Sequence, residues 1–221
     1  MGFFDYSLSI KDRIIDDFIT TLYMLGVSAI IAGIFGLVLG VIMVVTDKDR
    51  ILENKIVYSI LDKLTNLFRA IPFVILLALI APFTRLLVNT RIGPTAAIVP
   101  LSISTIPFFA RQVEQALAEV EPGKIEAAEA MGLSPIEIII SVYLREGLPS
   151  IIRASSITLI SLLGLTAMAG IVGAGGIGDL AISLGYKRYK DDVVIVSVIL
   201  IMVIVYIIQA IANYLIRKTS H

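Results

Sequence analysis

The sequence predicts an all-α protein that crosses a membrane several times. Of its 221 residues, 57% are hydrophobic and 16% are charged, and its mean hydropathy is +0.95. A chain of this size and composition has too little polar surface to cover a soluble globule. In hydrocarbon, a segment of about 20 apolar residues satisfies its own backbone groups only as a helix. We therefore predict one membrane domain, residues 1–221, with five spans at 18–46, 56–83, 92–110, 154–178 and 193–216.

The first span contains a glycine pattern, and the third span contains three prolines. The first span, 18–46, is uncharged and places Gly36 and Gly40 in a GxxxG pattern. The third span contains Pro94, Pro100 and Pro107. Because an interior proline removes a backbone donor, we expect this helix to be bent.

The second span, 56–83, is interrupted by charges in its first half. We expect it to form one helix that begins in water and enters the membrane near Arg69. Asp62, Asn66 and Arg69 share a helix face. The simpler interpretation is a helix base whose polar side chains reach the membrane interface, and the alternative is a charge on a transport path.

The fourth span, 154–178, is rich in glycine, alanine and serine. Such residues allow close packing at a bundle or dimer interface, and they would equally suit a pore lining whose glycine-rich end bends during gating. Met168 lies near the centre of this span, and its flexible apolar side chain is a candidate plug. The candidate gate or pore-lining residues are Met168, Gly164 and Gly170.

A polar segment, residues 121–149, separates the third and fourth spans. Pro122 suits the first turn of a helix, and Gly132 suits the left-handed position that ends one. These two residues predict a short helix at about 122–131. Small residues separate the acidic residues of this helix. This composition suits either a docking helix or an ordinary surface helix.

A second helix is predicted to begin at Ser134. Ser134 is a suitable N-cap, Pro135 a suitable first helical residue, and Glu137 completes a capping box. The two short helices should therefore meet at an angle near Gly132.

Five spans place the two termini on opposite sides of the membrane. More basic residues fall on the side of the polar segment and the C-terminus than on the other side. The positive-inside rule therefore favours an external N-terminus, a cytoplasmic C-terminus and a cytoplasmic segment at 111–153.

The polar segment resembles a motif of a known family. The residues EAA at 126–128 are followed by Gly132 and by VYL at 142–144. This pattern resembles the EAA motif of permease subunits in type I ATP-binding-cassette (ABC) importers, although Arg145 stands where the family usually has proline. The chain is similar to methionine-import permeases in particular at 68–73, 96–101, 107–111 and 172–178.

The resemblance implies a channel-forming subunit that is not itself an enzyme. It implies a homodimer in the bacterial cytoplasmic membrane, two copies of a separate ABC ATPase that binds ATP and Mg²⁺, and an extracytoplasmic methionine-binding protein. The implied cargo is methionine, in its L form and as the D form or related analogues; another amino acid or small polar solute is the open alternative. A cytoplasmic coupling helix between spans three and four would dock on the ATPase through Glu126, Ala127, Ala128, Glu129, Met131 and Gly132.

Composition and motifs argue against several other functions. The 18 basic and 18 acidic residues are scattered, which argues against nucleic-acid binding. There is no cysteine and the single histidine is His221, so we predict neither a metal site nor a histidine-dependent catalytic site. The one Gly-Lys pair, at 123–124, lacks the remaining residues of a phosphate-binding loop. ATP hydrolysis therefore requires another chain.

Two glycine patterns near the end of the fourth span suggest other functions. Gly173, Gly175 and Gly178 spell GxGxxG, but they end an apolar run instead of joining a strand to a helix. The sequence GIGD at 176–179 also resembles the motif of intramembrane aspartyl proteases. That chemistry needs two carboxylates sharing a site, so it is kept as a remote alternative that depends on Asp179.

Overall fold

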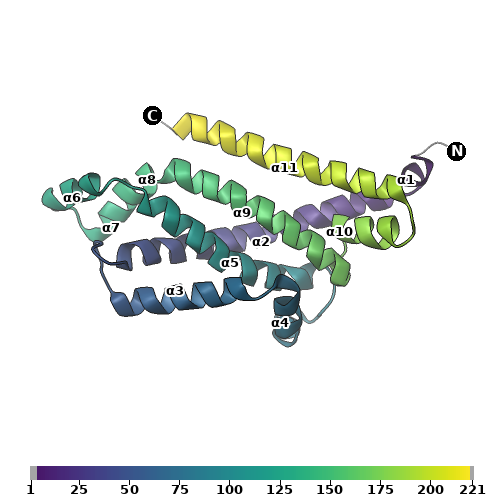
Figure 1. The fold of residues 1–221 in the computed structure, drawn as a ribbon, viewed down its shortest axis with the longest axis horizontal. Helices are drawn as coiled ribbons and strands as arrows, with labels where there is room; N and C mark the ends of the chain where they lie inside the picture. Colours follow the sequence, from purple (N-terminus) through teal and green to yellow (C-terminus); the bar gives the residue numbers. More distant parts are fainter. Residues whose placement is uncertain (1–3, 220–221) are drawn as a thin grey trace. The chain divides into compact units, whose positions relative to one another are not determined.

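The computed structural model describes residues 4–219 and is helical in every element of that range (Figure 1). His221 lies outside the described residues. The α-helices are α1 (Asp5–Ser9), α2 (Lys11–Thr46), α3 (Lys55–Ala70), α4 (Phe73–Val88), α5 (Pro94–Ala118), α6 (Pro122–Ala130), α7 (Pro135–Ile138), α8 (Leu144–Glu146), α9 (Leu148–Ala169), α10 (Ile177–Asp179) and α11 (Asp191–Thr219). Three π-helical segments, Ile139–Tyr143, Gly170–Ala174 and Leu180–Tyr186, complete the elements.

Four helices are long and apolar enough to cross a membrane: α2, α5, α9 and α11. The bent pair α3 and α4 would provide a fifth span. α5 is uninterrupted from Pro94 to Ala118, so its interior prolines do not break it, and it extends beyond the predicted end at residue 110.

The predicted continuous helix at 56–83 is wrong. α3 ends at Ala70 and α4 begins at Phe73, and the two helix axes differ by 107°. Pro72 explains the break, because proline cannot donate to the helix ladder and also disfavours the helical conformation of Ile71 before it.

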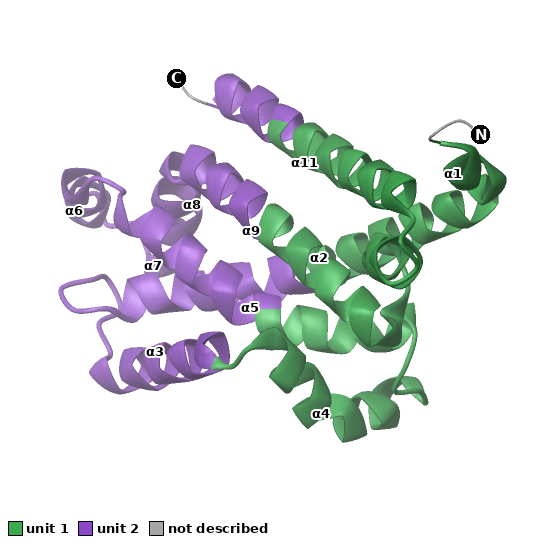
Figure 2. Ribbon diagram, turned by 45° about the vertical axis from the view of Figure 1, so that its right-hand side comes forward, with its two compact units in different colours: residues 1–30, 71–104, 159–209 green, residues 31–70, 105–158, 210–221 purple. Residues whose placement is uncertain are grey.

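Contacts within the chain define two compact units, coloured separately in Figure 2. Unit 1 comprises residues 1–30, 71–104 and 159–209, and unit 2 comprises residues 31–70, 105–158 and 210–221. Unit 1 has a core of side chains from α2, α4, α5, α9, α10 and α11. Unit 2 has a core in which α2, α5 and α9 pack against α6, α7 and Tyr143.

In unit 1, the predicted helix at 154–178 ends early. Val172 and Gly173 leave the helical conformation, and Gly175 and Gly176 have φ angles of +78° and +81°. Such backbone angles favour glycine, which explains why an apolar glycine-rich run breaks a helix here. The α9 helix therefore ends at Ala169, and a turn leads to α10.

The glycine-rich turn is held by side chains of α2 within the same unit. The Gly176 amide donates to Asp17 Oδ1 at 3.0 Å, and the Ile177 amide donates to Thr21 Oγ1 at 2.8 Å. These bonds satisfy backbone donors that the broken helix would otherwise leave unpaired.

In unit 2, the two glycines of the GxxxG pattern in α2 lie at a close contact with α5. A Cβ atom added to Gly36 would lie 2.9 Å from Phe109 Cδ1, and one added to Gly40 would lie 2.6 Å from the Ala110 carbonyl oxygen. Hydrogen in place of a side chain is thus what lets α2 approach α5.

We expect Gly40→Ala to destabilise the subunit by about 1–3 kcal/mol, because the added methyl group meets α5 backbone that cannot move alone. The midpoint of thermal unfolding in detergent measures this effect. Gly33→Ala on the same helix is the matched control, since nothing lies within 4 Å of its added Cβ atom. Equal midpoints for the two variants would contradict the close-packing assignment.

Candidate functional site

The polar segment begins with α6, and Gly132 takes the predicted left-handed position just after the end of this helix. Gly132 has a φ angle of +81°. Its amide donates to the Glu129 carbonyl at 2.9 Å, and the Leu133 amide donates to the Ala128 carbonyl at 3.2 Å. This pair of bonds is a Schellman motif, which closes the C-terminus of a helix with its own backbone.

The second short helix begins with the predicted capping box. The Ser134 amide donates to Glu137 Oε2 at 2.7 Å, and the Glu137 amide donates to Ser134 Oγ at 3.4 Å. The backbone hydrogen bond from Ser134 lowers the pKa of the Glu137 carboxyl group. Because this pKa is lowered, the carboxylate stabilises the cap above the usual carboxyl range, and this contribution is lost as pH falls through the lowered pKa.

Most of the predicted coupling residues form an exposed surface. Glu126, Ala127, Glu129 and Gly132 are exposed, and the Met131 side chain is 73% exposed. Ala128 differs, because it is 1% exposed and packs within the unit 2 core. Its expected role in docking is therefore corrected: it supports α6 from below.

A cavity of about 210 Å³ lies beside α6 within unit 2. Glu126 and Glu129 line it from α6, Arg50 lines it from the loop after α2, and Tyr143 lines it from the π-helical segment. Tyr143 is fully buried. Burial raises the pKa of its hydroxyl group, and nearby Arg50 opposes this shift. The predicted acidic residues thus border a pocket of mixed charge.

After α7 the chain remains helical up to and beyond Arg145. The chain stays helical through Ile139–Tyr143 and α8, and Arg145 is exposed. The Lys124 ammonium donates to Glu146 Oε2 at 2.5 Å, and this bond raises the pKa of Lys124 and lowers the pKa of Glu146. Both groups are exposed, so the ion pair contributes little to stability.

The three candidate gate residues are not equivalent. Gly164 and Met168 are exposed and lie four residues apart on one face of α9, and Met168 is 40% exposed. Gly170 is buried in the turn, where an added Cβ atom would lie 2.7 Å from the Asp179 amide nitrogen and 2.8 Å from the Gly175 oxygen. Gly170 is therefore a packing position of the turn and does not share the exposed face.

A polar cluster between α3 and α5 in unit 2 was not predicted. Arg111 forms ion pairs with Asp62 and, at 2.6 Å, with Glu114. The Tyr58 hydroxyl donates to Glu114 at 3.0 Å, and the Asn66 amide donates to Asp62 at 3.1 Å. The shared face of Asp62 and Asn66 was the available signal, but the sequence did not indicate Arg111 as their partner.

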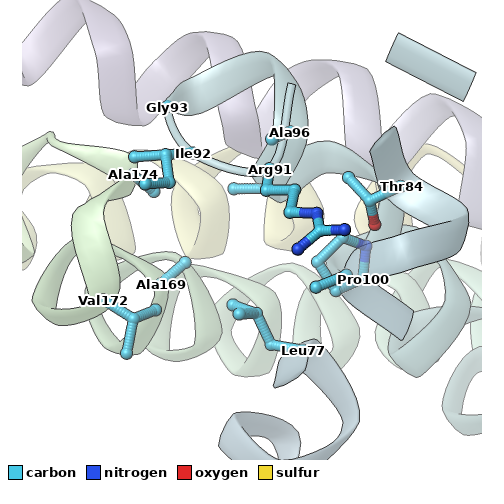
Figure 3. A pocket seen from close by; sticks show the side chains of 12 residues that line it. Leu77, Thr84, Arg91, Ile92, Gly93, Ala96, Pro100, Ala169, Val172 and Ala174 are labelled. Atoms are coloured by element: carbon cyan, nitrogen blue, oxygen red, sulfur yellow. The ribbon is translucent and has the colours of Figure 1, made fainter. Parts of the chain in front are cut away.

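A small pocket in unit 1 also contains a charged residue (Figure 3). Arg91 lies in it with its guanidinium group directed toward Thr84 and Pro100, among apolar side chains that include Leu77. The pocket has a volume of about 20 Å³. This is room for about one water molecule, so the pocket does not accommodate a larger ligand in this conformation.

The sequence of the chain matches a known family of transport proteins. The family described as binding-protein-dependent transport system inner membrane component matches residues 36–221. The chain belongs to this family. It is thus a membrane component of a transport system that works with a binding protein.

Individual members of the family are similar over most of the chain. The probable D-methionine transport system permease protein MetI of Vibrio cholerae serotype O1 is 45% identical over 201 residues, covering 91% of this chain and 89% of the relative. The methionine import system permease protein MetP of Bacillus subtilis is 44% identical over 172 residues, covering 78% of each.

Solved structures of the family share the fold. A chain of the MetNI methionine ABC transporter in an inward-facing conformation superposes with a TM-score of 0.94 at 40% identity, covering 96% of this chain and 99% of that one. An amino acid ABC transporter has a TM-score of 0.79 at 18% identity, covering 99% of each chain, and shows the fold alone.

The geometry of this family member disfavours the protease alternative. Asp179 forms an ion pair with Arg13 Nη2 at 3.3 Å, and Asp17 pairs with Arg13 Nε at 3.5 Å. The sequence did not indicate that Asp17 and Asp179 share a partner. An aspartyl dyad needs two carboxylates that share a proton directly, whereas the guanidinium group of Arg13 pairs with both of these carboxylates.

Proposed function

We propose that this chain is the permease subunit of an ATP-driven importer of methionine, taking the L and D forms and related analogues. The observation that carries the proposal is the similarity to the methionine transporter structure, at a TM-score of 0.94 and 40% identity across nearly the full length of both chains. Relatives named as methionine or D-methionine permeases support the same cargo.

The proposed assembly contains two copies of this chain, two copies of a separate ABC ATPase and an extracytoplasmic methionine-binding protein. ATP and Mg²⁺ bind the ATPase. The membership in a binding-protein-dependent family supports the external partner. Residues 1–221 act as one permease domain whose five spans include the α3–α4 pair as one.

The proposed topology places the N-terminus outside the cell and the polar segment and C-terminus in the cytoplasm. The chain has no cysteine, so single cysteines can report this directly. A cysteine at Ser134 should be labelled by an impermeant maleimide only after the membrane is opened, and one at Asp5 should be labelled in intact spheroplasts.

In the proposed mechanism, α6 is the coupling helix that docks on the ATPase. Its exposed residues, Glu126, Ala127, Glu129 and Met131, face outward from unit 2, while Ala128 anchors the helix to the core. ATP binding would bring the two ATPase subunits together, move both coupling helices and shift the permease from inward-facing to outward-facing.

Reconstitution tests the function. The permease, its ATPase and the binding protein in proteoliposomes should accumulate labelled methionine only when ATP is enclosed with the ATPase. A panel of other amino acids distinguishes the cargo. Accumulation of a different amino acid without methionine would overturn the substrate, and the absence of any ATP-dependent uptake would overturn the transport function.

We further propose that Met168 closes the path on the exposed face of α9. Met168→Ala should raise the ATP-independent leak of methionine from loaded liposomes several-fold, because a long flexible side chain is replaced by a methyl group. Met202→Ala is a control of the same chemistry on α11, since Met202 is also exposed. Equal leak from both variants would contradict the plug.

A further inference from the structure

We propose that a polar cavity between α5 and α9 in unit 2 is a binding site for a zwitterionic α-amino acid. The cavity has a volume of about 130 Å³, roughly ten times the space that one water molecule needs. This inference rests on the proposed function as an amino-acid importer and locates a site for its cargo. The residues that carry the argument are Gln112, Gln115, Glu119, Ser150, Arg153 and Ile157.

Two matching helix faces build the cavity. Gln112, Gln115 and Glu119 are spaced i, i+3, i+7 along α5 and the residue after its end. Ser150, Arg153 and Ile157 repeat the same spacing along α9. Residues at this spacing share one face of a helix, so the side chains come from two helices and not from a mobile loop.

The charges of the cavity are complementary to an amino acid. Glu119 and Arg153 are the two residues with ionised side chains that line it. Within residues 4–219 neither belongs to an ion pair, and Glu119 accepts one hydrogen bond, from Ser150 Oγ at 3.2 Å. A guanidinium group can bind a ligand carboxylate through two parallel hydrogen bonds, and a carboxylate can accept from a ligand ammonium group.

The remaining wall suits an uncharged side chain. Ala116, Ala154 and Ile157 provide apolar surface beside the two charges. The amides of Gln112 and Gln115 add donors and acceptors that can satisfy the remaining polar atoms of a ligand. A cavity with one cation, one anion and an apolar wall favours a small zwitterion over a sugar or an inorganic ion.

The position along α9 relates the cavity to transport. Arg153, Ile157, Ser161, Gly164 and Met168 are all exposed and recur every three or four residues, so they form one face of this helix. The cavity lies at the end of this face nearest the polar segment, which the proposed topology places in the cytoplasm.

Equilibrium binding tests the site in the nucleotide-free permease–ATPase complex, reconstituted in nanodiscs. Labelled L-methionine should bind the wild type, and Arg153→Gln and Glu119→Gln should each weaken binding at least about tenfold, as expected for the loss of a charge-assisted hydrogen bond. Arg217→Gln is the control, because Arg217 is exposed in unit 2 and lies outside the cavity. Gel filtration and thermal midpoints establish that each variant is folded.

Two methionine analogues separate the role of each charge. An amine that lacks the carboxylate should bind the wild type more weakly than methionine does, and Arg153→Gln should bind the two equally. N-acetylmethionine lacks the ammonium group and should bind the wild type more weakly than methionine does. Glu119→Gln should bind these two ligands equally. A merely structural role of either residue would weaken all ligands alike and would overturn the proposal.

Uptake by the same variants, reconstituted in proteoliposomes with the ATPase and the binding protein, separates this inference from the transport function. Wild-type methionine uptake together with unchanged binding in Arg153→Gln and Glu119→Gln would overturn the site alone. Absence of detectable methionine binding to an active wild-type complex would also overturn it. Absence of ATP-dependent uptake by the wild type would instead reject the proposed function on which the site rests.

Discussion

Gly132→Val should reduce ATP-dependent methionine uptake to background while the subunit still inserts into the membrane. Gly132 has a φ angle of +81°, which costs a β-branched residue about 1–3 kcal/mol. Nothing lies within 4 Å of an added Cβ atom, so the expected effect is backbone strain and not a steric clash. The strain should open the Schellman motif and misdirect α6, and uptake by proteoliposomes together with the amount of inserted subunit measures the result.

Gly123→Val provides the matched control on the same helix. Gly123 also has open space around an added Cβ atom, and its φ angle is not positive. Valine has a somewhat higher helix propensity than glycine, so the substitution should not weaken α6, and uptake should remain close to wild type. If Gly132→Val imported methionine normally, the coupling role of the polar segment would be rejected.

Gly170→Ala should strongly destabilise the subunit, because the segment after α9 leaves no room for a methyl group at this position. The new methyl group would meet backbone atoms of Asp179 and Gly175 at 2.7 Å and 2.8 Å, so no side chain can rotate away to relieve the contact. We expect the upper part of the range of about 1–3 kcal/mol that overpacking costs, measured as a lower midpoint of thermal unfolding.

Gly164→Ala is the comparison for this second variant. Gly164 lies six residues earlier, within α9, and nothing lies within 4 Å of its added Cβ atom. Alanine also has the higher helix propensity, so the midpoint should stay the same or rise slightly. A stable Gly170→Ala subunit would show that the turn can relax around an added methyl group.

Local features of the fold could be predicted from the sequence because their causes are local. The left-handed Gly132 and the capping box of Ser134 and Glu137 depend on residues within a few positions of one another, and the structure confirms both. The close contact at Gly36 and Gly40 was also predictable, because GxxxG spacing is typical of a position where a second helix packs closely. The spacing did not say which helix would approach.

Features that depend on distant residues could not be predicted. The sequence placed Asp62 and Asn66 on one face of a helix, but Arg111, 49 residues from Asp62, completes their cluster. The burial of Ala128 likewise depends on how α6 packs in the unit 2 core. Pro72 was a local signal for a helix break, but the length of the apolar run favoured one continuous helix. The angle between α3 and α4 depends on tertiary packing.

The capped helix ends in the polar segment affect the thermodynamics of binding a partner protein. α6 ends in hydrogen bonds between its own backbone groups, and the following helix begins with the reciprocal bonds of Ser134 and Glu137. A surface that is already ordered loses little conformational entropy when a partner binds. If the segment docks on the ATPase as proposed, binding should have a heat-capacity change no larger than the buried apolar area requires, without the additional change that coupled folding would produce.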